Sequence, residues 1–283
     1  MAKPTEVGGL TATTPLRDAG LSLVLARLFD VRRRELALFG ALGMDDVHDL
    51  RVATRRLRAA LRLFGKRQLR ATDGEVERLQ DALGEVRDLH VQQRWLADPG
   101  TVTAAERSAL TALGRDRARS LVFAERALLI ALKRWIEEGA PAVERAAHKV
   151  HDRGTLAGEL VSARLEKALR RVERARLEAL ASASPGAVHA FRIRLKQLRY
   201  LAELAGPALA PAWAERLTTF SAIQDDAGAL HDLDVRIELL EQPAWSLPGL
   251  LERLSRERAE HAKRISPQLA ALSLGASAPS ISG

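Results

Sequence analysis

Residues 48–62 read HDLRVATRRLRAALR, and this stretch decides the fold. Its apolar residues recur at helical spacing and predict a helix from about His48 to Lys66, with one buried side formed by Leu50, Ala53, Leu57, Ala60, Leu61 and Phe64. A second row, offset from the first by two residues, contains His48, Arg51, Arg55, Arg58 and Arg62. Because two residues turn a helix by roughly 200°, we expect this basic row nearly opposite the buried side.

The charge of this helix has one sign. Between Leu50 and Arg70 there are eight Lys or Arg residues and no Asp or Glu. A solvated helix face normally mixes its signs, because i,i+4 pairs of opposite charge stabilise the helix and like charges destabilise it. An ordinary solvated face is the simpler explanation of a charge run, but the missing acidic partners favour a site for an anion.

The same pattern occurs twice along the chain. Residues 189–199, HAFRIRLKQLR, match the first stretch at an offset of 141, with His189 on His48 and Lys196 on Arg55. Residues 79–91, LQDALGEVRDLHV, match residues 223–235, IQDDAGALHDLDV, at an offset of 144. Two matched blocks in the same order indicate an internal duplication. We therefore expect two similar four-helix halves, residues 16–140 and 155–270, related by a pseudo-twofold axis.

Composition supports an all-α protein with an anionic partner. Of 283 residues, 47% are hydrophobic, 28% are charged and only 4% are aromatic, which is typical of helical proteins. The formal net charge is +8, yet without the twelve basic residues of the two matched helices there are 32 basic against 36 acidic residues. The excess positive charge therefore resides in two short helices.

Several classes of protein are excluded or disfavoured. The absence of cysteine excludes disulfides, thiol nucleophiles and thiolate metal sites, and fits a reducing cytoplasm. The first fifteen residues lack the apolar core of a secretory signal, and the last nineteen are a poor membrane span. We expect residues 1–15 and 271–283 to be disordered, and we expect no membrane association.

Helix boundaries follow from prolines, glycines and capping residues. Asp45 or Asp46 is expected to cap the helix that carries His48, and Thr103 to cap a long helix that ends at Gly139 and Pro141. Ser184 and Pro185 are the expected start of the helix that carries His189. The other predicted helices span residues 16–40, 74–97, 155–182, 211–240 and 248–269, with a turn at 65–73 and a loop at 206–211.

The basic rows suit a linear polyanion. Successive cations lie about 5 Å apart along a helix, so five of them cover roughly 20 Å. The arginine fork grips two phosphate oxygens at once. His48 and His189 lie in first turns, where the helix dipole already favours an anion, and each can donate to a phosphate oxygen. Two histidines without nearby carboxylates make metal binding the weaker reading. If the halves pack about a twofold axis, the rows face each other across a basic central groove.

The second repeated block places an acidic pair and a glycine on one helix face, Asp81, Gly84 and Asp88 in one copy and Asp225, Gly228 and Asp232 in the other. We interpret the glycines as sites where a neighbouring helix approaches closely, and the aspartates as groups that orient arginines. No nucleophile, phosphate-loop or metalloenzyme motif stands out, so we expect no catalysis and no cofactor.

The motif His-x-x-Arg-[Val/Ile]-x-x-[Arg/Lys]-x-Leu-Arg, followed by Gln-Asp-x-x-Gly-x-x-x-Asp-Leu and duplicated, resembles the CHAD family, the conserved histidine α-helical domain. The resemblance covers residues 16–270 and implies two helical halves that bind inorganic polyphosphate along a basic groove, in some members at polyphosphate granules. Carried over by position, its binding residues are His48, Arg51, Arg55, Arg56, Arg58, His189, Arg192, Lys196 and Arg199, and Arg62 extends the first row.

This chain departs from the family pattern in places. Gln197 stands where Arg56 stands in the first half, and His231 replaces Arg87, so the second half is expected to grip less tightly. The chain has no Glu-x-Glu-x-Lys motif of the CYTH triphosphatase-like domain often fused to CHAD, which implies a binder without its own hydrolase. Weaker candidates for the same groove are Arg27, Arg34, Arg164, Arg171, Arg115 and Arg119.

Two alternatives remain open at this stage. The charge permits nucleic-acid binding, although the basic helices offer few groups for base readout and almost no aromatic residues for stacking. An enzyme or regulator of polyphosphate or nucleotide metabolism would use His48 and His189 as acid–base groups.

Overall fold

The computed structural model describes residues 3–40, 42–65, 67–149, 154–182, 184–209 and 213–272. Across these ranges every regular element is a helix, and the one strand-like feature is an isolated bridge between Pro15 and Leu156. The all-α fold class is therefore confirmed. The chain forms two compact units, one of Met1–Thr101 and Leu110–Leu160 and one of Val102–Ala109 and Val161–Gly283.

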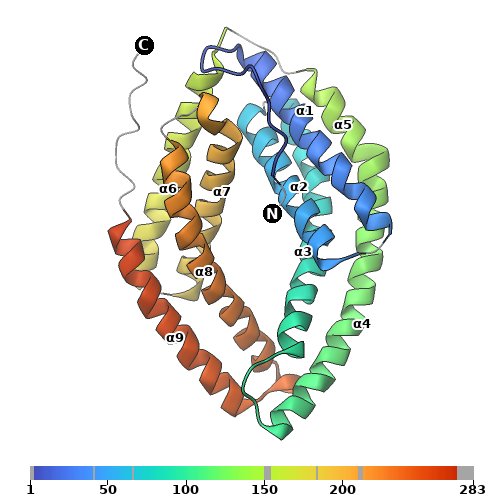
Figure 1. Ribbon diagram of the computed structural model, residues 1–283, viewed down its shortest axis with the longest axis vertical. Coiled ribbons are helices and arrows are strands. Elements are labelled where there is room, and N and C mark those ends of the chain that lie inside the picture. The colour runs from blue at the N-terminus through green and yellow to red at the C-terminus, as the bar shows by residue number, and fades with distance from the viewer. Residues whose placement is uncertain are drawn as a thin grey trace. The chain divides into compact units, whose positions relative to one another are not determined.

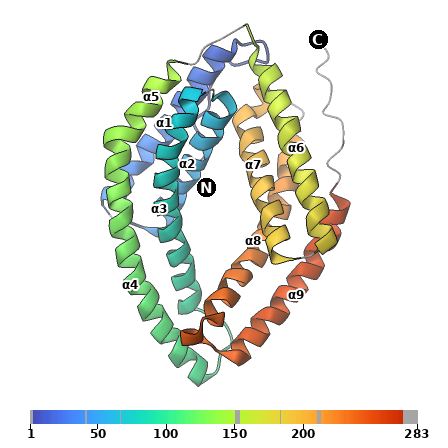
Figure 2. The ribbon, with the colours of Figure 1, turned by 180° about the vertical axis from the view of Figure 1, so that it is seen from behind.

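The first unit contains α1 (Leu16–Glu35), the 3-10 helix η1 (Leu36–Phe39), α2 (Met44–Phe64), α3 (Arg67–Ala97), most of α4 (Ala104–Arg134) and α5 (Ala140–Ala147). Helix α2 packs between α1 and α3, and α5 contacts both α1 and α3 (Figures 1 and 2). The predicted apolar side of α2 is buried at every position from Leu50 to Phe64. These side chains anchor the core of the unit.

Helix α3 begins earlier than predicted. The stretch 65–73 was expected to be a turn, but α3 starts at Arg67. Leu69 and Thr72 are buried there, and the Thr72 hydroxyl donates to the Leu69 carbonyl at 2.8 Å. Burial of Leu69 outweighs the roughly 1 kcal/mol that Gly74 costs in a helix interior. The early start brings Asp73 alongside α2.

Two of the three predicted helix caps are correct. The Glu106 amide donates to Thr103 Oγ1 at 3.2 Å and the Thr103 amide donates to Glu106 Oε2 at 2.8 Å, which is a capping box. Ser184 Oγ accepts from the Ala187 amide at 3.2 Å at the start of α7. The third prediction is wrong, because α2 starts after Gly43 without a side-chain cap, and Asp45 and Asp46 lie within its first turn.

Gly139 and Pro141 do not end the fourth helix as predicted. A π-helical turn, Trp135–Gly139, connects α4 directly to α5, and the Ala140 amide donates to the Trp135 carbonyl. Pro141 lies at the start of α5, where its missing N–H costs nothing. A Cβ at Gly139 would lie 2.6 Å from Trp135 Cε3, so this turn requires glycine. Trp135 is fully buried, and its Nε1 donates to Glu35 Oε2 at 2.9 Å.

The second unit contains most of α6 (Ala157–Ser182), α7 (Pro185–Leu209), α8 (Ala214–Glu241), the 3-10 helix η4 (Pro243–Trp245) and α9 (Pro248–Ala271). Helix α8 packs between α7 and α9, and Arg176 Nη1 of α6 donates to the Leu269 carbonyl of α9 at 2.9 Å. The predicted loop 206–211 begins later, because α7 kinks at Gly206 (φ 60°) and continues to Leu209. Pro211, the predicted start of the next helix, lies outside the described residues.

The segment before α1 is ordered where it is described, contrary to the expected disorder of residues 1–15. The Thr5 hydroxyl donates to Asp30 Oδ1 at 2.6 Å, and the Gly158 amide donates to the Ala12 carbonyl at 3.0 Å. Threonine hydroxyls and backbone groups thus fix a stretch that has little hydrophobic signal. Residues 273–283, also expected to be disordered, lie outside the described part of the chain. Within that part, no helix is long and apolar enough to span a bilayer.

Candidate anion-binding sites

The basic row of α2 borders α3 and does not lie opposite the core as predicted. A Cβ added at Gly84 of α3 would lie 3.6 Å from Arg51 Nη2, and Arg58 is only 7% exposed. Each of these arginines directly follows a core leucine, Leu50 or Leu57, and one residue turns a helix by about 100°. The row therefore lies on the flank of α2 where α3 packs.

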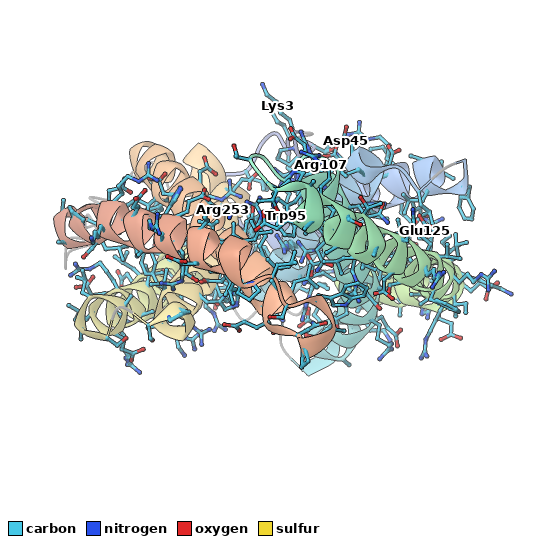
Figure 3. The ribbon with its side chains drawn as sticks, turned by 90° about the horizontal axis from the view of Figure 1, so that it is seen from below. Lys3, Asp45, Trp95, Arg107, Glu125 and Arg253 are labelled. Atoms are coloured by element: carbon cyan, nitrogen blue, oxygen red, sulfur yellow. The ribbon has the colours of Figure 1, made fainter. Side chains whose placement is uncertain are left out.

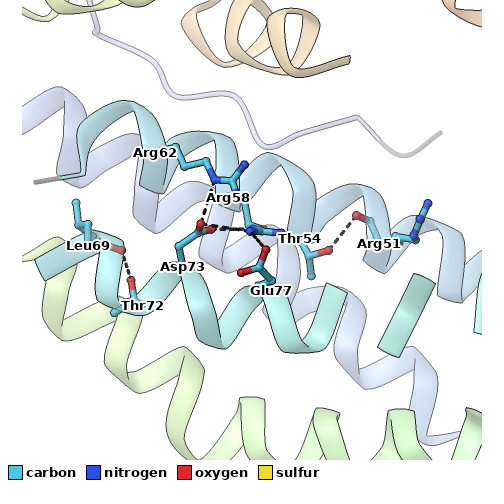
Figure 4. Close-up of polar contacts among 8 residues, drawn as sticks. All are labelled: Arg51, Thr54, Arg58, Arg62, Leu69, Thr72, Asp73 and Glu77. Atoms are coloured by element: carbon cyan, nitrogen blue, oxygen red, sulfur yellow. Dashed lines mark hydrogen bonds and ion pairs between the residues drawn. The ribbon is translucent and has the colours of Figure 1, made fainter. Parts of the chain in front are cut away.

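The C-terminal end of this row is paired with acidic residues, as Figure 4 shows. Arg58 Nε donates to Asp73 Oδ1 at 2.7 Å, and Arg58 Nη2 donates to Glu77 Oε1 at 2.6 Å. Arg62 Nε donates to Asp73 Oδ2 at 3.0 Å. The prediction that the row lacks acidic partners is wrong here. Asp73 and Glu77 both belong to the first turns of α3. The sequence predicts a turn at residues 65–73, so it does not place these acids beside α2.

The pKa values around Asp73 reflect this pairing. Burial alone would raise the pKa of Asp73, but the Arg58 hydrogen bond and the nearby charge of Arg62 outweigh it and hold the pKa below its usual value. Burial would likewise lower the pKa of Arg58, but its bonds to Asp73 and Glu77 raise it instead. Asp73 and Arg58 therefore stay ionised near neutral pH, and the acidic partners of Arg58 and Arg62 offset the positive charge at this end of the row.

The N-terminal end of the row keeps its positive character. Arg55 makes no ion pair or hydrogen bond with any residue that the structure describes. Burial lowers the pKa of His48, the positive charges of Arg87 and Arg51 lower it further, and Asp49 opposes them. We define His48, Arg51, Arg55 and Arg87 as the first-unit cluster. Its α2 members span about 10 Å along the helix, half the length predicted for the whole row.

Arg56, Arg27 and Arg34 do not join this cluster. Arg27 is buried beside Asp30, with Nη1 to Oδ2 at 3.2 Å, and also donates to the Thr5 carbonyl. Arg34 Nη1 donates to the Asp30 carbonyl at 2.7 Å. Burial lowers the pKa of Arg34, Asp30 opposes this effect, and the charge of buried Arg56 also lowers the pKa. The side chains of Arg27, Arg34 and Arg56 instead contribute to the packing of α1 against α2 and the N-terminal segment.

The second unit brings together a histidine pair. The rings of His189 on α7 and His231 on α8 have centroids 4.7 Å apart and are tilted by 41°. Burial lowers the pKa of His231 to about 4, with help from Arg192 and His189 and against Asp232 and Asp234. Burial, Arg192 and Lys196 lower the pKa of His189, and Asp234 opposes them.

These residues form the second-unit cluster: His189, Arg192, Lys196, Arg199 and His231. The Arg199 guanidinium lies 5.1 Å from the ring centroid of Tyr200, within cation–π distance. Asp234, whose charge opposes the lowering of the pKa of both histidines, accepts at its Oδ1 from Arg258 Nε of α9 at 2.6 Å. Asp234 is thus already engaged by α9.

Arg87 and His231 were not among the predicted binding residues, although the repeat contained the signal. They occupy matched positions at the offset of 144, one helix after His48 and His189. In the first unit Arg87 lowers the pKa of His48, and in the second unit the charge of His189 lowers the pKa of His231. His48 and His189 are the fifth residues of α2 and α7, so both lie past the first turns predicted for them. His90 of α3 was also missed. It is buried, its pKa is lowered by burial, and Glu125 of α4, marked in Figure 3, opposes the shift.

The glycines of the repeated block do not have the predicted role. The contact at Gly84 is an ordinary one with the Arg51 side chain, and no described atom lies within 4 Å of a Cβ at Gly228. A methyl group therefore fits at both positions, and neither glycine marks a close helix crossing. The remaining weaker candidates lie outside the two clusters, Arg164 and Arg171 on α6 and Arg115 and Arg119 on α4. No group of three or more metal-ligating side chains occurs in the described ranges.

The chain belongs to the CHAD domain family. The family's sequence model matches residues 23–241. The fold is similar to the crystal structure of the CHAD domain from the plant Ricinus communis, with a TM-score of 0.69, 22% identity, and coverage of 97% of this chain and 98% of that one. It is also similar to PptA from Streptomyces chartreusis, with a TM-score of 0.64, 17% identity, and coverage of 92% and 100%. A comparison with curated proteins gives no match.

Proposed function

We propose that this protein binds inorganic polyphosphate through the first-unit and second-unit clusters. The observation that carries the proposal is that each unit places a histidine among cations: His48 lies near Arg51 of α2 and Arg87 of α3, and His189 lies near Arg192 and Lys196 of α7. Burial and these positive charges lower the pKa of each histidine. An anion is the counter-charge that such a site favours. Membership of the CHAD family, which is associated with polyphosphate in general, supports the same ligand.

The side chains fit a chain of phosphates better than a single phosphate. Arg51 and Arg55 in one unit, and Arg192 and Lys196 in the other, recur at helical spacing and can engage successive phosphate groups. Each histidine can donate a hydrogen bond and can take up a proton when the anion binds. The acids at Arg58 and Arg62 limit the first-unit cluster to the N-terminal half of α2.

Binding is proposed to occur without catalysis. The clusters offer cations and histidines but no nucleophile with a base beside it, which supports a binding role. In a cell, such a protein would gather where long polyphosphate accumulates, for example at polyphosphate granules.

The test is a set of titrations with long-chain polyphosphate, tripolyphosphate and orthophosphate at about 50 and about 200 mM salt. We expect the affinity to rise steeply with chain length. We also expect it to fall as the salt concentration rises, because binding releases the counterions condensed on the polyanion. Long polyphosphate should displace single-stranded RNA of matched charge, and no orthophosphate should be released. Equal affinity for the three phosphates, or preferential binding of RNA, would refute the proposal.

A further inference from the structure

The solvent side of α4 carries large apolar side chains. Their exposed fractions are 47% for Val122, 69% for Phe123, 42% for Leu129 and 73% for Ile130. The opposite side of α4 is the ordinary core side, with buried Leu110, Leu113, Leu128 and Leu132. Contiguous exposed apolar surface is uncommon on a protein that works alone and is typical of interaction sites.

Arginines lie between these apolar side chains. At about 100° per residue, Val122 and Leu129 form one line along α4, and Phe123 and Ile130 form a second line about 100° further round. Arg115, Arg119 and Arg126 fall between the two lines. They are exposed, and none forms an ion pair or hydrogen bond with the residues that the structure describes. We call these seven residues the α4 face.

The last helix of the second unit shows what an ordinary exposed helix of this protein looks like. The solvent side of α9 mixes its charges, with Arg256 Nη2 donating to Glu252 Oε1 at 3.0 Å, and exposes no large apolar side chain. In contrast, three of the six phenylalanines of the chain are more than half exposed, and all three belong to the first unit: Phe29, Phe39 and Phe123. Most exposed large apolar side chains thus belong to a few helices of the first unit, and the α4 face does not reflect the general composition of the surface.

We propose that the α4 face binds an acidic amphipathic segment of a partner protein, such as a helix with a row of carboxylates between two apolar stripes. The carboxylates would pair with Arg119 and Arg126, and the apolar stripes would cover Phe123 and Ile130. Arginine and aromatic side chains are the usual energetic anchors of protein interfaces. Residues 115–130 offer about 22 Å of helix, which corresponds to four turns of a docked helix.

The charge of the α4 face favours an acidic segment over a second copy of the chain and over a lipid bilayer. A second copy of the chain would set the Arg126 rows of two molecules against each other, and like charges in contact oppose association. A lipid bilayer would receive the arginines at the centre of the apolar arc, at the deepest point, whereas interfacial helices keep cations on their polar side. An acidic segment satisfies both the arginines and the apolar stripes.

The experiment uses fluorescence anisotropy with a labelled helical peptide that has glutamates between two leucine and phenylalanine stripes, and a scrambled peptide of the same composition. The test variant is Phe123→Ser with Arg126→Glu. The matched control is Leu177→Ser with Lys263→Glu, which replaces one exposed apolar residue of α6 and one exposed cation of α9 by the same two residue types. We expect the full protein to bind the designed peptide, the test variant to bind it about tenfold more weakly, and the control to be unchanged.

Further measurements separate the outcomes. Both variants should keep the thermal midpoint and the polyphosphate affinity of the parent protein. Peptide binding does not depend on polyphosphate binding, so failure of the proposed function would not affect this test. Equal binding of the scrambled peptide would overturn the proposal. So would tight binding to phosphatidylglycerol-containing vesicles without peptide binding, or a dimer in sedimentation velocity that the test variant abolishes.

Discussion

The imidazole rings of His189 and His231 lie 4.7 Å apart on adjacent helices. The matched pair in the first unit is His48 and Arg87, in which the partner on the next helix carries a permanent charge. The two clusters therefore differ in chemistry, because the partner on the next helix carries a fixed charge in the first unit, at Arg87, and a charge that depends on pH in the second, at His231.

Binding of polyphosphate should become tighter as the pH falls from about 8 to about 5. At neutral pH the lowered pKa values keep both histidines of the pair neutral, and a bound phosphate raises these values by favouring the charged form. Proton uptake on binding can be measured by calorimetry in buffers of different ionisation enthalpy.

The variant His231→Arg reproduces the residue found at Arg87 and serves as the control for this effect. We expect tighter binding at about pH 8 and a smaller dependence on pH, since one titrating group is replaced by a permanent cation. An unchanged pH profile in this variant would show that the histidine pair takes no part in binding.

The free energy of unfolding should also decrease as the pH is lowered, because His231 takes up a proton more readily in the unfolded chain. Its pKa is about 4 in the folded protein and is near 6.5 in an unfolded chain, so the unfolded state binds more protons between these values. The contribution of this group to stability is complete above about pH 6.5 and is lost as the pH falls towards 4. Urea unfolding at about pH 7 and about pH 5 should show a smaller difference in His231→Gln than in the parent protein.

Asp73→Asn should destabilise the first unit, because it removes the carboxylate that Arg58 and Arg62 share. The buried Arg58 would lose a charge-assisted hydrogen bond, at a cost of about 2 kcal/mol. Asp81→Asn on the exposed side of α3 is the matched control and should change the free energy of unfolding by less than about 0.5 kcal/mol. Urea denaturation measures both.

Asp73→Asn also tests whether the first-unit cluster excludes Arg58 and Arg62. Removal of a negative charge beside the basic row should increase the affinity for long polyphosphate. A lower affinity in folded Asp73→Asn would mean that Asp73 instead holds Arg58 and Arg62 in a binding position.

Two glycine substitutions should have opposite effects on stability. Gly84→Ala places a methyl group at ordinary contact distance from Arg51 and gains helix propensity, which should stabilise the protein by about 0.5–1 kcal/mol. Gly139→Ala drives a methyl group into the Trp135 ring and should destabilise it by about 1–3 kcal/mol. Thermal unfolding of the two variants compares them, and a tolerated Gly139→Ala would show that the π-turn relaxes easily.

Periodicity along the chain predicted the helices well, because a buried stripe such as Leu50, Leu57 and Leu61 leaves a direct trace in the sequence. Local signals also predicted the caps at Thr103 and Ser184, where one side chain bonds to a nearby amide. The start of α3 and the α4–α5 junction were wrong because tertiary packing of Leu69 and Trp135 overrides weak turn and proline signals.

The candidate site was predicted less completely than the fold. A helical stripe identifies the residues that share a face, but it does not show which neighbouring helix covers that face. The pairing of Arg58 with Asp73 and Glu77, and the burial of Arg27 beside Asp30, depend on how α1, α2 and α3 pack. The duplication and the basic groove between the halves stay predictions.

The most direct measurement titrates long-chain polyphosphate into a variant in which both clusters are neutralised, Arg51→Ala and Arg55→Ala with Arg192→Ala and Lys196→Ala. The control replaces the same number of exposed cations elsewhere, Arg94, Arg174, Arg256 and Lys263. We expect at least about a hundredfold loss of affinity and a shallower salt dependence in the first variant, and a much smaller loss in the control. Equal losses in the two variants would show that polyphosphate is held by the net charge of the protein and not by these clusters.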